Sequence, residues 1–483
     1  MFLFQYLWLA AAIPCKIFFI FFVSFSITVH AHESLPHEPW FLSFEQTINI
    51  AQRYDPWLVG NNYQQSALQS LSTAQSSLPD ARLSLSFANL PIDTFNFNQE
   101  AMTRFTVGIS QVFPRGDSLA LNRQYQQSQS EAFPFQRQDR SEKVAVTVGS
   151  LWLDIYKMDQ TSKLISESYV LFEQLVAAAQ ARYSSGVGNV RQHNIVRAQV
   201  ELTLLQERLA KIQQHRSALQ GRLLAWFVNV EPLQKNRTNK RTTSLLPSLS
   251  ANNMMTEIVS LVGDIPELTM RYSETVSSVN LLSIERLHHL FYQHPAVLAF
   301  DKRLQASKTS VLLAKQRHKA QWGINASYGY RPDDMMNDTR SDLFSVGVSL
   351  DVPLFSDDRN DKYVDASIAS SEAMKTEKKL LVRQLFSSYA SDKARLLSVQ
   401  KRLSLYQDML IPQVTNLARV ALSAYKNDDG EFSEVVKARI TVLNTKIEKL
   451  ALDIDQQKLI LELNYVFASA ATSFQHKNIQ PRS

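Results

Sequence analysis

The sequence predicts a mainly helical fold with a small membrane-spanning β component, built from two tandem copies of one unit. Phe105–Ser110 (FTVGIS) recurs as Phe344–Ser349 (FSVGVS) 239 positions later, and Asp55-Pro56 corresponds to His294-Pro295 at the same spacing. Four short segments alternate apolar and small polar residues. The stretches between them are rich in Gln, Ser, Ala and Leu, and the 483 residues include only 12 glycines, which favours long helices. Two copies of one unit imply that neither completes the structure alone.

The first 31 residues predict a secretory signal peptide. Residues 18–27 form an apolar run that follows Lys16 and ends shortly before Val29-His30-Ala31, a small-x-small cleavage pattern. The run is too short for a spanning helix. An uncleaved anchor or a misassigned start is the alternative. Cys15, the only cysteine, lies inside this segment, so we expect the mature chain to contain no disulfide.

The rest of the chain is mildly basic and contains no long apolar run. Without Lys16 the formal net charge of +6 becomes +5, and this charge is not concentrated in one patch, so nucleic acid is not expected as a partner. Because no further stretch approaches the 18 apolar residues of a spanning helix, a mature chain that crosses a membrane must do so with strands.

The alternating segments predict transmembrane strands over about 81–90, 103–113, 321–331 and 342–354. Their length suits a tilted strand that crosses a bilayer, and the face opposite the apolar one is mostly Ser, Thr, Asn and Gly, as expected of a wet lumen. A soluble sheet with one buried face is the alternative. Four strands cannot close a barrel, and open edges are not tolerated in lipid. Several copies must therefore pool their strands, and a symmetric trimer would provide twelve.

Each second strand leads into a predicted pair of long antiparallel helices, over about 116–182 and 190–227 in the first copy and 358–424 and 433–468 in the second. Pro134 and Pro412 should bend or interrupt these helices. The predicted organisation is a signal peptide (1–31), a first repeat (32–230), an irregular linker (231–280), a second repeat (281–475) and a tail (476–483). Helix pairs of this length suit side-by-side packing into a cylinder, and an antiparallel coiled-coil rod is the alternative.

Three motifs in this order carry a resemblance to a known family. They are Leu42–Ala51 (LSFEQTINIA) followed by Asp55-Pro56, Val107–Gly116 (VGISQVFPRG), and Arg182–Gly188 (RYSSGVG). Over about residues 42–470 the chain resembles the TolC-like outer-membrane efflux proteins. The resemblance implies a homotrimer with a 12-stranded β-barrel in the outer membrane of a Gram-negative bacterium and an α-helical tunnel in the periplasm.

The resemblance also implies the function and the partners. The expected role is the passive exit duct of a tripartite efflux pump, with a periplasmic adaptor protein, an inner-membrane pump and outer-membrane lipid as partners, and with neither enzymatic activity nor a cofactor. Residues 89–93, 102–104 and 111–117 look most like the subgroup that serves metal-exporting pumps of the resistance–nodulation–division type. The conduit of a type I protein secretion system and a structural periplasmic coiled-coil protein are the alternatives.

The second-repeat tip is the candidate periplasmic gate. Family members close the tunnel with carboxylates there, and matching residues 434–438 (EVVKA) to that segment places Glu434 at a gate position. Lys437 stands where many members carry a second acid. Asp428, Asp429 and Glu431 lie at the same tip, and symmetric copies of them would converge into a cation-attracting aperture. A solvated turn with ordinary acids is the alternative.

A second set of tip residues is the candidate contact with the adaptor. By resemblance this set comprises Arg182, Tyr183, Gly186, Val187, Gly188, Tyr425 and Gly430. Positive φ at a chain reversal would also explain the glycines.

The histidines do not predict a metal site. His32, His37, His288, His289 and His294 lack the Cys or carboxylate spacing that would complete one. The sequence also contains no nucleophile–base pair and no phosphate-binding loop, so no catalytic residue is predicted.

Overall fold

The computed structural model describes residues 41–185, 192–227, 260–261, 264–271, 284–333, 339–427 and 429–468. The predicted signal peptide, the tail and most of the predicted linker lie outside these residues. The described part is mostly helical with few strands, which confirms the mainly helical fold. None of the described helices is both long and apolar enough to cross a membrane.

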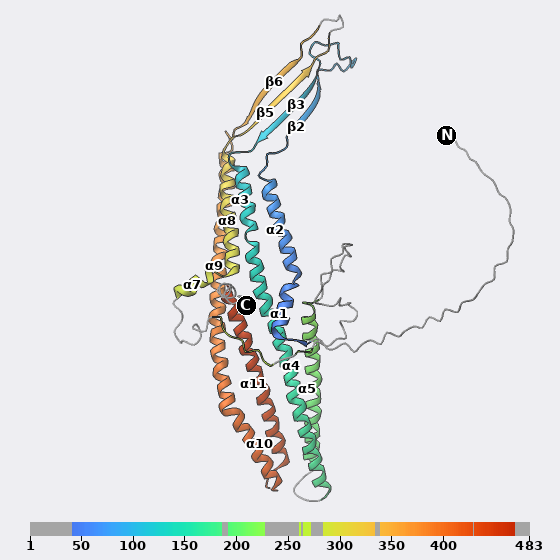
Figure 1. Cartoon of the computed structure of the whole chain (residues 1–483), viewed down its shortest axis with the longest axis vertical. Helices are drawn as coiled ribbons and strands as arrows, with labels where there is room; N and C mark the ends of the chain where they lie inside the picture. Colours follow the sequence, from blue (N-terminus) through green and yellow to red (C-terminus); the bar gives the residue numbers. More distant parts are fainter. Residues whose placement is uncertain are drawn as a thin grey trace, which may run out of the picture. The chain divides into compact units, whose positions relative to one another are not determined.

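The strands form one antiparallel sheet of four, in the order β2-β3-β5-β6 (Figure 1). The strands are β2 (Arg82–Ala88), β3 (Arg104–Phe113), β5 (Gln321–Tyr330) and β6 (Leu343–Asp351). The two hairpins meet through β3 and β5, where Gly108 pairs with Ser327. The outer edges of β2 and β6 pair with no other described strand.

The register gives the sheet one polar and one apolar face, because side chains alternate along a strand and cross-strand partners share a face. On the polar face, Ser84 pairs with Gly108 and Ser327 with Ser345. On the apolar face, Leu85 pairs with Val107. The side chains of the apolar face are largely exposed, among them Leu83, Leu85, Phe87, Phe344, Val346, Val348 and Leu350, each at least 64% exposed.

Four helices connect directly to the strands and pack in the order α2-α3-α8-α9 (Figure 1). They are α2 (Pro56–Ala74), α3 (Ser118–Ser130), α8 (Pro295–Lys315) and α9 (Asp357–Leu405). Asp55 and His294 begin α2 and α8 in the same way, since each side chain accepts a backbone N–H two residues on and each is followed by proline.

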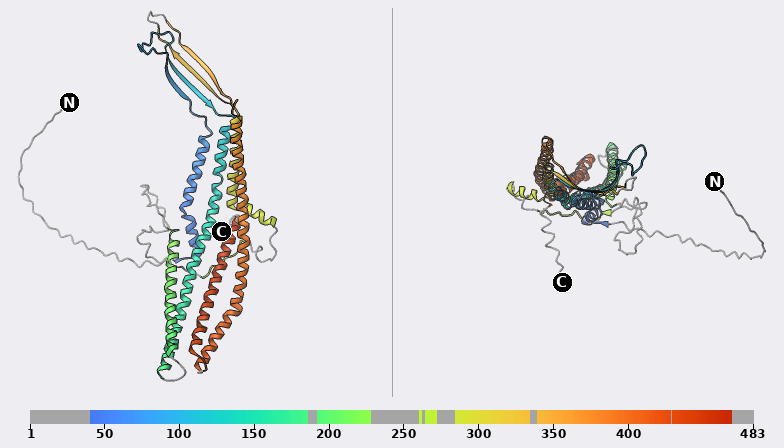
Figure 2. Two further views of the ribbon diagram at one scale, coloured as in Figure 1. Left: turned by 180° about the vertical axis from the view of Figure 1, so that it is seen from behind. Right: turned by 90° about the horizontal axis from the view of Figure 1, so that it is seen from above.

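The helices farther from the sheet pack in the order α5-α4-α11-α10. They are α4 (Phe133–Ser184), α5 (Gln192–Leu224), α10 (Ile411–Lys426) and α11 (Phe432–Val466). Seen end-on, the helices lie side by side in one curved layer (Figure 2). A layer only one helix thick leaves much apolar surface exposed, as at Val196, Val200, Leu417 and Val420, each at least 50% exposed.

Both prolines interrupt the long helices, for a common physical reason. The helix expected over 116–182 is divided at Glu131-Ala132, and Pro134 stands in the first turn of α4. Before Pro412, residues Tyr406–Leu410 form a π-helical turn, and α10 then begins. Proline has no N–H and its ring clashes with the carbonyl four residues earlier, so it is tolerated at the start of a new helix. The π turn widens the backbone where the clash would fall.

The shorter elements brace the middle of the long helices. They are β1 (Phe41–Leu42), which pairs in parallel with β4 (Ser260–Leu261), α1 (Phe44–Arg53) and α7 (Ile284–Tyr292). The short helix η1 (Gln316–His318) lies elsewhere, between α8 and β5. α1 packs on α4, where a Cβ at Gly149 would lie 2.9 Å from Leu461 Cδ1 and 3.2 Å from the Phe44 ring. Gly149 therefore permits the close approach of three helices and does not break α4.

Candidate functional site

The two helical hairpins contact each other at their tips through Arg182 and Tyr425. Arg182 lies in the last turn of α4, and its Nη1 donates a hydrogen bond of 3.0 Å to the backbone carbonyl of Tyr425 near the end of α10. The guanidinium carbon also lies 5.1 Å from the centroid of the Tyr425 ring. A cation suits this place, because the last carbonyls of a helix lack internal donors and carry partial negative charge.

Tyr425 belongs to the apolar core of the tip. Its side chain is 7% exposed and its ring centroid lies 5.4 Å from that of Phe432 in α11. Phe172 and Ile195, from α4 and α5, belong to the same cluster. The hydroxyl of Tyr425 is buried and forms no hydrogen bond with any residue that the structure describes. The ring therefore holds the two hairpins together and leaves little surface for a partner.

The other predicted adaptor-contact residues differ in exposure. Tyr183 is 49% exposed and available to a partner. Gly430 is exposed, and its φ is not positive, so the alternative explanation by positive φ does not apply to this glycine. A Cβ at Gly430 would lie 2.9 Å from Ala424 Cβ and 3.1 Å from Tyr425 N, so the tight return of the chain requires glycine here. Gly186, Val187 and Gly188 lie outside the described residues.

The predicted gate acids lie at the start of α11. Glu431 precedes the helix as its N-cap, and its carboxylate accepts a hydrogen bond of 3.2 Å from the Ser433 hydroxyl. Glu434 is exposed and forms an ion pair of 2.8 Å with Lys437, one turn later. Asp429 is exposed, and Asp428 lies outside the described residues. Within one copy, Lys437 thus offsets the charge of Glu434, while Asp429 and Glu431 form no described ion pair.

His294 has a structural role far from the tips. The side chain is fully buried, Nδ1 accepts a hydrogen bond from Ala296 N, and Nε2 lies 3.1 Å from the carbonyl of Tyr465, to which it donates. Burial lowers the pKa of the His294 imidazole, and Asp139 acts in the opposite direction. Burial raises the pKa of the Tyr465 hydroxyl, which donates to Asp139 over 2.8 Å. Among the described residues, no group of three or more His, Cys, Asp or Glu could hold a metal ion.

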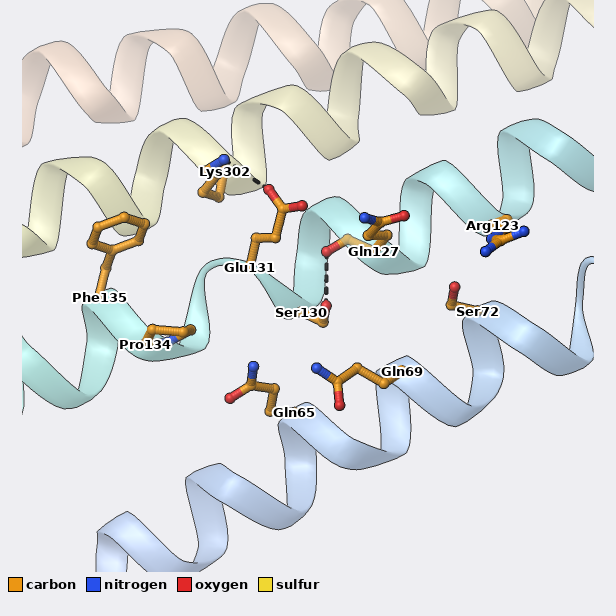
Figure 3. A pocket seen from close by; sticks show the side chains of 10 residues that line it. All are labelled: Gln65, Gln69, Ser72, Arg123, Gln127, Ser130, Glu131, Pro134, Phe135 and Lys302. Atoms are coloured by element: carbon orange, nitrogen blue, oxygen red, sulfur yellow. Dashed lines mark hydrogen bonds and ion pairs between the residues drawn. The ribbon is translucent and has the colours of Figure 1, made fainter.

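A polar cleft of about 550 Å³ opens where α3 gives way to α4 (Figure 3). One wall is α2, the other is formed by α3 and the start of α4, and Lys302 reaches in from α8 to pair with Glu131 over 2.7 Å. The break before Pro134 opens this space. Half of the ten lining residues carry amide or hydroxyl groups, namely Gln65, Gln69, Ser72, Gln127 and Ser130.

The junction between sheet and helices depends on Arg115, a residue without an assigned role in the sequence prediction. Its guanidinium forms an ion pair with the Asp351 carboxylate at the end of β6 and donates a hydrogen bond of 2.7 Å to the carbonyl of Arg317. Gly116 follows with φ +47°, and a Cβ there would lie 2.3 Å from Lys319 Cδ. The turn from β3 into α3 therefore requires glycine.

An open antiparallel sheet that continues into long helical hairpins is the fold of outer-membrane channel proteins. The chain resembles CmeC, an outer-membrane channel of Campylobacter jejuni, at 11% identity and a TM-score of 0.69, covering 90% of this chain and 89% of that one. It also resembles VceC, an outer-membrane protein of Vibrio cholerae, at 13% identity and a TM-score of 0.66, covering 88% of this chain and 96% of that one. Its similarity to CusC, which forms a transmembrane channel, is 14% identity with a TM-score of 0.66, covering 89% of this chain and 93% of that one.

No protein-family model matches the chain, and no curated protein matches it. The similarity to solved channel structures, in contrast, confirms the predicted resemblance to TolC-like proteins at the level of the fold.

Proposed function

We propose that this protein is the outer-membrane exit duct of a tripartite efflux pump in a Gram-negative bacterium. Copies of the chain form a homotrimer, whose pooled strands close a 12-stranded barrel in outer-membrane lipid and whose helices form a tunnel in the periplasm. The duct is passive, and a periplasmic adaptor and an inner-membrane pump deliver the cargo. The likeness of fold to outer-membrane channels supports this proposal.

The observation that carries the proposal is the state of the sheet in a single copy. Both edge strands carry unpaired backbone groups, and most of the apolar face is exposed. In water such a face favours association, and in lipid an open edge leaves backbone N–H and C=O groups without partners. Pairing of β6 with β2 of the next copy removes both edges, and lipid then covers the apolar face. A soluble rod would need neither feature.

The two tips have different proposed roles. Tyr183, with Gly186, Val187 and Gly188 at the first tip, contacts the adaptor, while Arg182 and Tyr425 hold the two hairpins together. Asp428, Asp429, Glu431 and Glu434 converge near the axis and narrow the periplasmic mouth. The pump is of the resistance–nodulation–division type, by the resemblance of the strand-to-helix segment.

The test combines isolation with conductance. We expect the mature chain to fractionate with the outer membrane as a heat-labile trimer and to form discrete channels in planar bilayers. A strain that lacks the protein should accumulate the cargo when challenged with metal salts and drugs, and should still secrete polypeptides, which separates the pump from a type I system. A water-soluble monomer without affinity for detergent or lipid would refute the proposal.

A further inference from the structure

The polar face of the sheet carries a simple charge pattern. Among the 36 residues of β2, β3, β5 and β6, only Arg82, Arg104 and Asp351 are charged. All three lie on the polar face, because they belong to the same alternating rows as Ser84, Thr106 and Ser349.

The carboxylate of this set is already neutralised. Asp351 lies at the end of β6 and pairs with Arg115, which follows β3. Asp342, the acid next to the start of β6, is held by the Tyr328 hydroxyl and by the backbone N–H of Arg331. Tyr328 belongs to the apolar face, where it pairs with Val107 and Phe344, so the Asp342 carboxylate is drawn toward the outer side of the sheet.

The two arginines have no such partner. Neither Arg82 nor Arg104 forms an ion pair or a side-chain hydrogen bond with any residue that the structure describes, and the Arg104 Nε is buried without one. The side chain of Arg104 lies across Gly329 of β5, since a Cβ there would lie 3.4 Å from Arg104 Cδ.

The arginines occupy the two ends of the polar face. Arg82 begins β2 and Arg104 pairs with Ala88, six positions further along that strand. At about 3.3 Å per residue, the level of Arg82 and the level of Arg104 are separated by about 20 Å along the strands. The rows between them hold only uncharged side chains, such as Ser84, Ser86, Thr106 and Ser327.

We propose that Arg82 and Arg104 make the membrane section of the duct favour anions, so that its cargo consists of solutes bearing carboxylate, phosphate or sulfate groups and not of free metal cations. This inference rests on the proposed function, which turns the polar face toward the lumen. Copies around one axis place the arginines in two rings of one sign, an arrangement used by anion pores. A lumen lined by one sign of charge concentrates the opposite ion.

The experiment measures ion selectivity in planar bilayers with the full-length mature protein. The reversal potential under a KCl gradient gives the chloride-to-potassium permeability ratio for wild type, for R82Q and R104Q singly and together, and for the matched R82K and R104K variants. Every variant keeps the same acidic tip, so differences between them report only on the strand section. Heat-labile trimers on a gel show that each variant assembles.

We expect the permeability ratio to fall at least about twofold in the double Gln variant and to stay at the wild-type value in the Lys variants. The expected effect lies below the roughly 10- to 1,000-fold enrichment of narrow one-signed clefts, because 0.1 M salt screens charges over about 10 Å. An unchanged ratio in the double Gln variant, or an equal fall in the Lys variants, would overturn the inference. Wild-type protein that forms no channel would overturn the proposed function instead.

Discussion

Replacing Arg182 with Ala should loosen the contact between the two helical tips. The variant loses a charge-assisted hydrogen bond of 3.0 Å to the Tyr425 carbonyl and a cation–π contact of 5.1 Å. Such a hydrogen bond contributes about 1.5–3 kcal/mol and an exposed cation–π contact about 0.5–1 kcal/mol. Because Arg182 is only half-buried, we take a total of about 2 kcal/mol per copy. An opening motion that separates α4 from α10 would then become roughly 30-fold more favourable in each copy.

Single-channel recording in planar bilayers measures this change as the fraction of time spent in the highest conductance level. Two controls separate the tip contact from other effects. Arg197→Ala removes the same charge from an exposed position of α5, and Tyr425→Phe keeps both the ring and the carbonyl that Arg182 contacts. We expect both controls to gate like wild type, and Tyr425→Phe to be neutral or stabilising, because the hydroxyl it removes is buried without a described partner. Arg182→Ala with wild-type opening would refute the reasoning.

Three further predictions concern packing, pH and the gate. In thermal melts, Gly149→Val should lower the free energy of unfolding by about 1–3 kcal/mol, because its Cβ would lie 2.9 Å from Leu461 Cδ1. The control Gly221→Ala should be neutral or stabilising, because no atom lies within 4 Å of its new Cβ. Burial lowers the pKa of His294 in the folded chain, so the unfolded chain takes up a proton first as the pH falls below about 6.5; stability should fall below that pH, and denaturant titrations of His294→Asn should show a smaller fall. Glu434→Ala should raise single-channel conductance or leakage, and unchanged conductance and cation selectivity would remove Glu434 from the gate.

Much of the fold follows from period and composition. Alternation with a period of two placed the strands within a few residues of β2, β3, β5 and β6, because apolar and polar faces demand that spacing. The helices α1, α2 and α8 received no predicted ranges, although Asp55-Pro56 and His294-Pro295 are N-terminal capping signals that mark where α2 and α8 begin. The apolar residues of α8 face two neighbours, α3 and α9, in a thin layer, and this blurs a single amphipathic stripe.

The tip contacts could be predicted only in part, because they depend on distant pairs. The motifs indicate Arg182 and Tyr425 separately, and nothing in their spacing of 243 positions indicates that one caps the helix of the other. The ion pair of Glu434 with Lys437 can be predicted from the sequence, since residues three apart share a helix face. The arginines of the polar face were also visible, as Arg82 and Arg104 stand at the ends of alternating segments. Their lack of partners required the register.

The order of elements across the layer favours closure by copies of the same chain. The first half of the sequence supplies one side of every level, with β2, α2 and α5, and the second half supplies the other side, with β6, α9 and α10. Val196 and Val200 of α5 are exposed on the first side, and Leu417 and Val420 of α10 on the second. A copy that adds its β6 to β2 therefore also brings its α10 toward α5, so one rotation satisfies the strand edge and the helix edge together. Such a head-to-tail contact is heterologous and becomes stable as a ring only when the rotation closes.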